Sequence, residues 1–198
     1  MSALEPLSPL RGAFFPGHHG ASGAGRVEIR HIATSIVEVM APPQHEAAVN
    51  GMIEQALGIG VPKPGVAVVH GPLAAVWLRP ASIMVLEEIA NAGDLMKRLS
   101  SAVTAPAALV DQTHAKTVIR LSGANARPVM AKGCRLDLHP RVFRAAASAS
   151  TQIGHINCTF LQRDEAPTFD IVVPSTFARA FLDWLLPASE EFGAELDV

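Results

Sequence analysis

Hydrophobic residues recur, from residue 27 onward, with the periods of strands and helices. Segments that are rich in Ile, Val and Thr, or that alternate between apolar and polar residues, predict strands. Their ranges are 29–40, 66–69, 76–78, 83–86, 107–110, 117–121, 148–163 (one or two strands) and 169–173. Apolar residues spaced by three and four predict helices at 44–57, 91–102, 125–133 and 175–186.

Residues that favour helix ends mark these four helices. Short polar side chains that accept hydrogen bonds from free N–H groups are expected as N-caps at Asn91, Asn125 and Ser175. Gly58 and Gly133 are predicted left-handed C-caps. Pro187 is expected to end the last helix, because proline removes a helical hydrogen-bond donor.

The order of these elements repeats along the chain. Strand, helix, strands and helix occur in about 27–112 and again in about 113–187, as expected for a duplicated split β-α-β unit. The predicted fold class is α+β, a single domain over 27–187 with two ferredoxin-like halves and mixed or antiparallel sheets. Residues 1–26, rich in Gly and Pro, are expected to be a flexible N-terminal arm, either disordered or lying on another surface. Residues 188–198 are expected to be a C-terminal tail.

The low content of charged residues indicates a subunit of a larger assembly. Of the 198 residues, 49% are hydrophobic and 17% are charged, whereas about 25% are charged in a typical soluble domain. A chain of this size is not expected to hide all its apolar residues in its own core, so either an apolar patch is exposed or a partner covers it. A formal net charge of −2, with no basic block, excludes the usual footprint of a nucleic-acid-binding protein. No run of about 18 apolar residues predicts a membrane span.

The first residues and the two cysteines favour a cytoplasmic protein. Glu5, Pro6 and Pro9 interrupt the apolar run that a signal peptide requires. Cys134 and Cys158 do not have the spacing of a zinc site, so reduced thiols are expected.

The sequence contains no motif typical of a catalytic or cofactor site. Glycine-rich phosphate-binding loops and the Gly-x-Ser-x-Gly motif of α/β-hydrolases do not occur. The adjacent His18 and His19 lack the nearby ligands that would complete a metal site. We therefore assign no catalytic, cofactor-binding or metal-binding residue.

Two polar stretches, 111–123 and 132–140, are candidates for a structural or an interface role. In the first, a hydrogen-bonded corner between the halves is favoured over a ligand pocket. In the second, a polar corner is favoured over an interface, and an interface over a thiol-based site whose cysteine pKa is lowered by neighbouring cations. Asp137 is assigned to a local turn and His139 to a partner surface. The candidate interface or structural residues are Asp111, His114, Lys132, Gly133, Cys134, Asp137 and His139.

The same stretches carry a family resemblance. The strings Asp111-x-Thr-His-x-Lys-Thr-x-x-x-Leu-Ser-Gly, Lys132-Gly-Cys-x-Leu-Asp-Leu-His-Pro and Thr168-Phe169-Asp170 resemble the gamma subunit family of heterotetrameric sarcosine oxidases. The likeness covers roughly residues 27–187, and the Lys132 string is its most specific part. More distantly, the Asp111 string resembles folate-binding aminomethyltransferases, the T-proteins of glycine cleavage.

The resemblance implies a non-catalytic, accessory subunit of an oxidoreductase complex. Such a complex oxidises sarcosine to glycine and passes the methyl carbon to tetrahydrofolate. The implied partners are alpha, beta and delta subunits, which hold FAD, FMN, NAD, the tetrahydrofolate site and zinc. Two alternatives stay open: the corresponding subunit of an N-methylglutamate dehydrogenase or related N-demethylase, and a freestanding aminomethyltransferase-like protein that binds folate.

Overall fold

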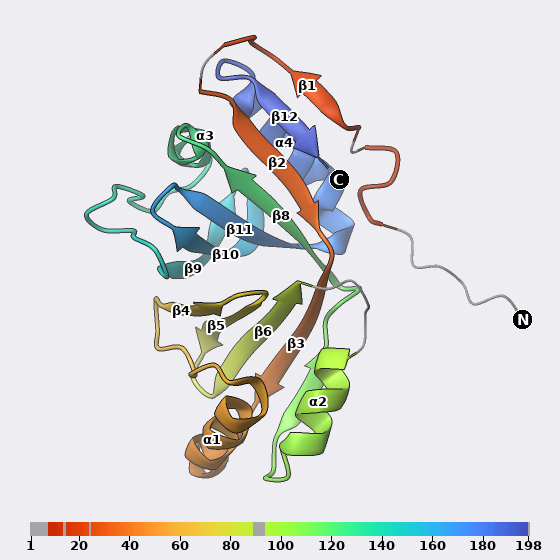
Figure 1. The fold of residues 1–198 in the computed structure, drawn as a ribbon, viewed down its shortest axis with the longest axis vertical. Helices are drawn as coiled ribbons and strands as arrows, with labels where there is room; N and C mark the ends of the chain where they lie inside the picture. Colours follow the sequence, from red (N-terminus) through yellow and green to blue (C-terminus); the bar gives the residue numbers. More distant parts are fainter. Residues whose placement is uncertain (1–7, 14, 24, 89–93, 198) are drawn as a thin grey trace, which may run out of the picture.

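Two β-sheets lie face to face, and a pair of helices covers the outer surface of each sheet (Figure 1). The computed structural model describes residues 8–13, 15–23, 25–88 and 94–197. The predicted α+β class, with mixed and antiparallel sheets, is confirmed. No helix among these residues is long and apolar enough to cross a membrane.

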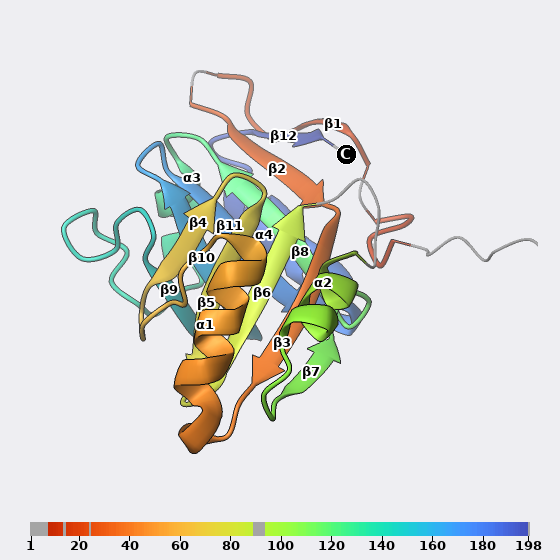
Figure 2. The ribbon, with the colours of Figure 1, turned by 60° about the horizontal axis from the view of Figure 1, so that its bottom comes forward.

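The first sheet has five strands in the order β4-β5-β6-β3-β7, and all its strand pairs are antiparallel. Helices α1 and α2 cover its outer face and lie in front of the sheet in Figure 2. A short 3₁₀ turn, Pro43–His45, precedes α1. The bounds are β3 Thr34–Met40, α1 Glu46–Leu57, β4 Ala67–His70, β5 Leu73–Arg79, β6 Ser82–Glu88, α2 Asp94–Ala102 and β7 Ala108–Asp111.

The second sheet has seven strands in the order β1-β12-β2-β8-β11-β10-β9. Its pairs are antiparallel except that β12 runs parallel to β2. Helices α3 and α4 cover its outer face, and a 3₁₀ turn, Ser175–Phe177, precedes α4. The bounds are β1 Gly17–His19, β2 Val27–Ile32, β8 Lys116–Ser122, α3 Ala126–Ala131, β9 Ser148–Ile153, β10 Ile156–Asp164, β11 Thr168–Pro174, α4 Ala178–Ser189 and β12 Ala194–Asp197.

Successive side chains of a strand point to opposite faces of its sheet, and the buried ones form three separate cores. In β3, Val37 and Val39 pack under the helices, while Ile36 points at the other sheet. In β11, Phe169 and Ile171 pack under α3 and α4 in the same way. The opposite face of β11 is also buried, because Val172 and its neighbours meet the first sheet. Much of the apolar content of the chain is therefore buried within these three cores.

The segment 29–40, predicted as one strand, forms two strands in different sheets. Its backbone leaves the second sheet after Ile32 and enters the first at Thr34, whose hydroxyl donates a hydrogen bond to the Ile32 carbonyl over 2.9 Å. β2, which the sequence analysis placed in the first half, therefore pairs with β8 of the second half. The residues of 29–40 carry no signal for this change of sheet, because the pattern indicates where strands form and not which sheet each strand joins.

Segments near both ends of the chain extend the second sheet. The expected tail includes β12, in which Ala194 and Leu196 are 1% and 2% exposed and lie in the core. The expected N-terminal arm includes β1, which pairs with β12, so this part of the arm lies on its own chain (Figure 1). These short strands are stabilised by pairing with distant segments, which local sequence patterns do not show.

The helix ends are partly as expected. Gly58 adopts the left-handed conformation, with φ of 69°, and its N–H donates to the carbonyl of Glu54, so this C-cap is confirmed. Asn125 does precede α3, but its side-chain amide donates to the Gly25 carbonyl over 2.6 Å instead of capping the helix. Asn91 lies outside the described residues.

Three other predictions about helix ends are wrong. α3 ends at Ala131, its C-cap is Lys132 in a right-handed conformation, and Gly133 does not have a positive φ. Ser175 begins a 3₁₀ turn and its side chain makes no cap bond, so α4 starts at Ala178. α4 continues through Pro187 to Ser189. The proline lies in the last turn, where it removes only one helical hydrogen bond, and Ser189 Oγ adds a hydrogen bond to the Leu185 carbonyl.

Candidate functional site

The corner at Asp111 joins the two sheets. Asp111 ends β7, and its Oδ1 accepts a hydrogen bond from the Thr113 N–H over 2.9 Å. Thr113 Oγ1 in turn accepts the N–H of Ile36 over 3.0 Å. The hydrogen bonds with Thr113 lower the pKa of Asp111 and outweigh the opposing effect of burial, and the charge of His114 adds to the lowering. The geometry favours the structural interpretation of Asp111 over the pocket, because its carboxylate is already bound within the turn.

Four charged side chains form a cluster between the sheets. Arg120 Nε and Arg163 Nε lie 2.6 and 2.5 Å from the two carboxylate oxygens of Asp170, which is 3% exposed. Arg120 Nη2 and Arg163 Nη2 each lie 2.6 Å from Glu88 Oε1, at the end of β6. Burial acts to lower the pKa of Arg120, but its bonds with Asp170 and Glu88 outweigh this effect and raise it. The cluster therefore links three strands of the second sheet to the first sheet.

This cluster was missed in the sequence analysis, although a local signal exists. Arg120, Arg163 and Asp170 occupy the same strand face as Val118, Leu161 and Val172, which are buried between the sheets. Charged residues at such positions are expected only where they are paired.

The loop between α3 and β9, residues 132–147, contains the whole of the second candidate stretch, 132–140. Asp137 Oδ1 accepts the N–H of His139 over 2.8 Å, which confirms the turn predicted for Asp137. The His139 ring is exposed, and its Nδ1 accepts the N–H of Arg141 over 3.2 Å. Leu138 and Phe143 insert into the core beneath the second sheet. A partner contact for His139 stays a prediction.

At the start of this loop, Lys132 and Gly133 contact the end of α4. Lys132 Nζ donates to the Ala188 carbonyl over 2.5 Å and lies 2.6 Å from a carboxylate oxygen of Glu191. Gly133 lies against the indole ring of Trp184, so that a Cβ atom built on it would come within 2.3 Å of the ring. Lys132 thus binds the end of α4 through its charge, Gly133 packs against α4, and a left-handed cap at Gly133 is excluded.

Both cysteine thiols are free and buried. Burial raises the pKa of Cys134 above its ordinary value, and it raises that of Cys158 to about 12. The sequence-based alternative that neighbouring cations lower the pKa of Cys134 is therefore wrong. A thiol that stays protonated is a poor nucleophile.

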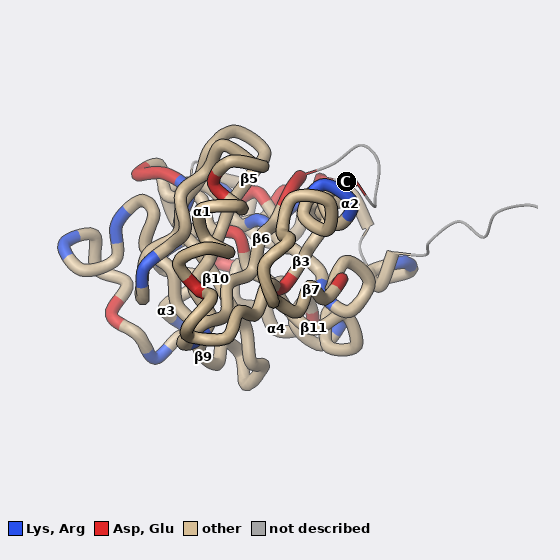
Figure 3. The backbone as a smooth tube through the Cα atoms, turned by 90° about the horizontal axis from the view of Figure 1, so that it is seen from below, with Lys and Arg blue, Asp and Glu red and all other residues tan. Residues whose placement is uncertain are grey.

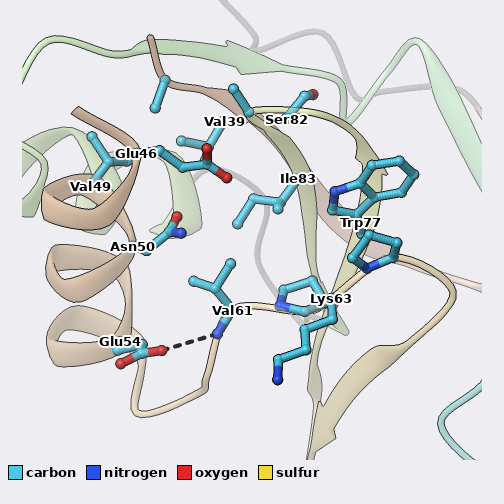
Figure 4. Close-up of a pocket in the computed structure, with 14 residues that line it drawn as sticks. Val39, Glu46, Val49, Asn50, Glu54, Val61, Lys63, Trp77, Ser82 and Ile83 are labelled. Atoms are coloured by element: carbon cyan, nitrogen blue, oxygen red, sulfur yellow. Dashed lines mark hydrogen bonds between the residues drawn. The ribbon is translucent and has the colours of Figure 1, made fainter. Parts of the chain in front are cut away.

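A cavity of about 350 Å³ opens between α1 and the first sheet (Figure 4). Val39, Val49 and Ile83 contribute apolar surface, and the side chain of Glu46 points into the space (Figure 4). Trp77 lies on the opposite side. An apolar floor with a carboxylate suits a small ligand that carries a cationic group. Glu54, also in the lining, accepts the N–H of Val61 over 3.2 Å and is therefore partly engaged within the chain.

A second cavity of about 580 Å³ lies on the second sheet near β9 and β10. Its lining is mainly polar and includes Ser150 and Thr159, whose hydroxyls are 2.9 Å apart. Neither cavity is lined by Asp111, His114 or the other candidate residues of the 132–140 stretch.

The tandem histidines bind other groups of the chain. His18 Nε2 donates to the Gly20 carbonyl over 3.1 Å, and its Nδ1 lies 3.7 Å from Glu195. Within the described ranges, no three His, Cys, Asp or Glu side chains are grouped so that they could hold a metal ion.

Replacing Asp137 by alanine should destabilise the isolated chain. The substitution leaves the His139 N–H without its partner, so we expect the free energy of unfolding to fall by about 1 kcal/mol. His139→Ala is the matched control: its imidazole accepts the Arg141 N–H over 3.2 Å, a longer bond than the 2.8 Å bond to the Asp137 carboxylate, and we expect a smaller loss. Urea denaturation of both variants measures the difference, and equal midpoints would show that the turn does not depend on the carboxylate.

Sequence comparisons identify the family. The model of the sarcosine oxidase, gamma subunit family matches residues 41–191. The sarcosine oxidase subunit gamma of Corynebacterium sp. (strain P-1) is 31% identical over 180 residues, which are 88% of this chain and 85% of that one. The protein of the same name from an Arthrobacter species is 31% identical over 179 residues, covering 87% of this chain and 85% of the relative.

Solved structures agree with the sequence comparisons. A chain of the heterotetrameric sarcosine oxidase from Corynebacterium sp. U-96, in complex with pyrrole 2-carboxylate, matches with a TM-score of 0.77 and 26% identity over 88% of both chains. The glycine cleavage system aminomethyltransferase T from Bartonella henselae shares the fold, with a TM-score of 0.63 and 16% identity over 86% of this chain and 47% of that one. The resemblance to the gamma subunit family is confirmed, the likeness to the aminomethyltransferase is one of fold, and the chain belongs to the sarcosine oxidase gamma subunit family.

Proposed function

We propose that this chain is the gamma subunit of a cytoplasmic sarcosine oxidase complex and acts in it as a structural, non-catalytic component. The observation that carries the proposal is the match to gamma subunits over most of both chains, in sequence and in fold. The reaction of the complex is then the oxidative demethylation of sarcosine to glycine, with the methyl carbon passed to tetrahydrofolate.

The non-catalytic role is supported by what the candidate polar groups do in the fold. The carboxylates of Asp111 and Asp137 accept backbone N–H groups of their own turns. Lys132 binds the end of α4, and the Cys134 thiol is buried with a raised pKa. Groups already engaged in this way are poorly placed to transfer protons or attack a substrate.

In this proposal the cofactors belong to alpha, beta and delta partner subunits. A dinucleotide site normally uses a glycine-rich turn between a strand and the helix of a parallel βαβ unit. In the described part of the chain, the parallel strand pair is β2 with β12. Most of the chain lies between these two strands, so they are not joined by a single helix as in a βαβ unit. The described residues therefore do not form the usual binding site for FAD or NAD. In this proposal the flavins, NAD, tetrahydrofolate and zinc are all bound by the partner subunits.

Co-expression with the alpha, beta and delta subunits tests the proposed function. We expect a complex that oxidises sarcosine and that fails to assemble stably when this chain is omitted, because partner binding stabilises the folded subunits. The isolated chain should be colourless and should neither oxidise sarcosine nor transfer a one-carbon unit. A stoichiometric flavin spectrum from the isolated chain, or a fully assembled complex without it, would contradict the proposal. Assays with N-methylglutamate in parallel distinguish the related dehydrogenase.

A further inference from the structure

The α3–β9 loop, residues 132–147, is held firmly although much of its surface is uncovered. Phe143 stacks on Phe160 with ring centroids 4.9 Å apart, and Leu138 is 6% exposed. Arg127 Nη1 donates to the Leu138 carbonyl over 2.5 Å. Near its end, the loop is tied to the first sheet, since the Ala67 N–H donates to the Ala146 carbonyl over 2.7 Å.

The outward side chains of this loop include large aliphatic groups. Val142 is 63% exposed and Leu136 is 40% exposed, which places both among the exposed large apolar side chains of the described chain. Their neighbours Leu138 and Phe143 are buried. The loop therefore uses some apolar residues as anchors and presents others to the outside.

The same loop presents arginines that have no acidic partner. Arg135, Arg141 and Arg144 are exposed, and their guanidinium groups make no ion pair with any described residue. Some other surface arginines are paired, as Arg79 with Glu38 and Arg98 with Glu87, whereas Arg11 and Arg179 make no ion pair with a described residue. In Figure 3, blue and red positions are scattered over the backbone, and long stretches are uncharged. Within the loop, four basic residues outnumber one acidic residue, Asp137, and Glu165 faces the loop from outside by accepting the Ala145 N–H over 3.1 Å. Positive charge therefore predominates in this loop of a protein whose net charge is −2.

We propose that the loop surface formed by Arg135, Leu136, Arg141, Val142 and Arg144 docks onto an acidic surface of a partner subunit that has an apolar recess for Val142. This inference rests on the proposed function. Unpaired arginines around exposed aliphatic side chains are typical of interface residues, and complementary charge speeds association and selects the partner. Because the loop is already ordered, binding loses little conformational entropy. A second copy of this chain fits less well, since a two-fold contact would bring the same arginines together.

Charge reversal in the loop tests the docking surface. Arg141→Glu/Arg144→Glu is compared with Lys63→Glu/Lys97→Glu, which changes the same charge on exposed residues near the first sheet. Val142→Ser is compared with Val110→Ser, another exposed valine. Each tagged variant is co-expressed with the alpha, beta and delta subunits. Binding affinity for these subunits and the thermal midpoint of the isolated chain are then measured.

We expect both loop variants to bind at least about tenfold more weakly, with thermal midpoints close to that of the unchanged protein. The two controls should bind normally. Raising the salt from about 0.1 M to about 1 M should weaken the unchanged complex more than the charge-reversed one, because screening removes the attraction. Hydrogen exchange should show protection of the loop amides in the complex.

Normal binding by the charge-reversed variant, or unprotected loop amides in an assembled complex, would overturn the docking surface while leaving the proposed function intact. Equal salt dependence of the two complexes would overturn the acidic partner surface. If the unchanged chain does not bind the subunits at all, the proposed function itself fails, and with it this inference.

Discussion

Asp170→Asn is expected to lower the free energy of unfolding by about 3–5 kcal/mol, the usual result of breaking a buried ion pair on one side. Asp170 receives hydrogen bonds from Arg120 and Arg163 at distances of 2.5–3.0 Å, and its side chain is 4% exposed. Asparagine keeps the shape but removes the negative charge and turns an N–H group toward the two guanidiniums. Glu88 alone then remains to compensate them within the cluster.

The exposed pair of Arg30 and Asp197 provides the control for this substitution. The two side chains are 2.8 Å apart but are 48% and 59% exposed, so Asp197→Asn should cost less than about 1 kcal/mol. Urea denaturation at constant pH and salt measures both variants. If the two midpoints shift equally, the cluster between the sheets does not stabilise the fold as its geometry indicates.

Gly133→Val should lower the free energy of unfolding by about 3 kcal/mol, near the upper end of the range for overpacked cores. A Cβ atom on Gly133 would meet Trp184 Cζ2 at 2.3 Å and the Gly154 nitrogen at 2.8 Å. Trp184 packs against the core and contacts Phe181 with ring centroids 5.5 Å apart, so its ring cannot move away freely. The strain arises from contact and not from the backbone angle.

Gly51→Val is the matched control, because a Cβ atom there meets no neighbour within 4 Å and the residue lies inside α1. Valine has a higher helix propensity than glycine, so this variant should be slightly more stable than the unchanged protein. Adding Trp184→Leu to Gly133→Val removes the clash with the indole ring and should restore part of the lost stability. The recovery should be incomplete, because the close contact with the Gly154 nitrogen remains. Thermal and urea denaturation measure all three variants. A Gly133→Val protein as stable as the Gly51→Val protein would exclude the steric explanation.

Local chemistry in the sequence was enough to predict several parts of the candidate stretches. Asp137 lies in the turn expected for a short carboxylate next to free N–H groups, and Asp111 holds its corner in the same way. Gly58 ends α1 as predicted. In each case the interacting groups lie within a few residues of one another, so the local pattern contains the whole interaction.

The contacts that distinguish this molecule join distant segments. Lys132 binds the Ala188 carbonyl 56 positions away, and Arg120 binds Asp170 at a separation of 50. Gly133 is needed because Trp184, on another helix, lies against it. A residue type alone does not reveal such a neighbour, and the glycine was therefore interpreted as a helix cap.

The sequence by itself determined the types of the main elements, the α+β class and the family, because periodicity and motif are properties of short segments. Only the tertiary structure decided that 29–40 divides between two sheets, that both chain ends add strands, and that charged residues meet between the sheets. Strand pairing and face-to-face packing depend on which distant segments bury each other's surface. Strand pairing therefore cannot be predicted from one segment, because the two paired segments are far apart in the sequence.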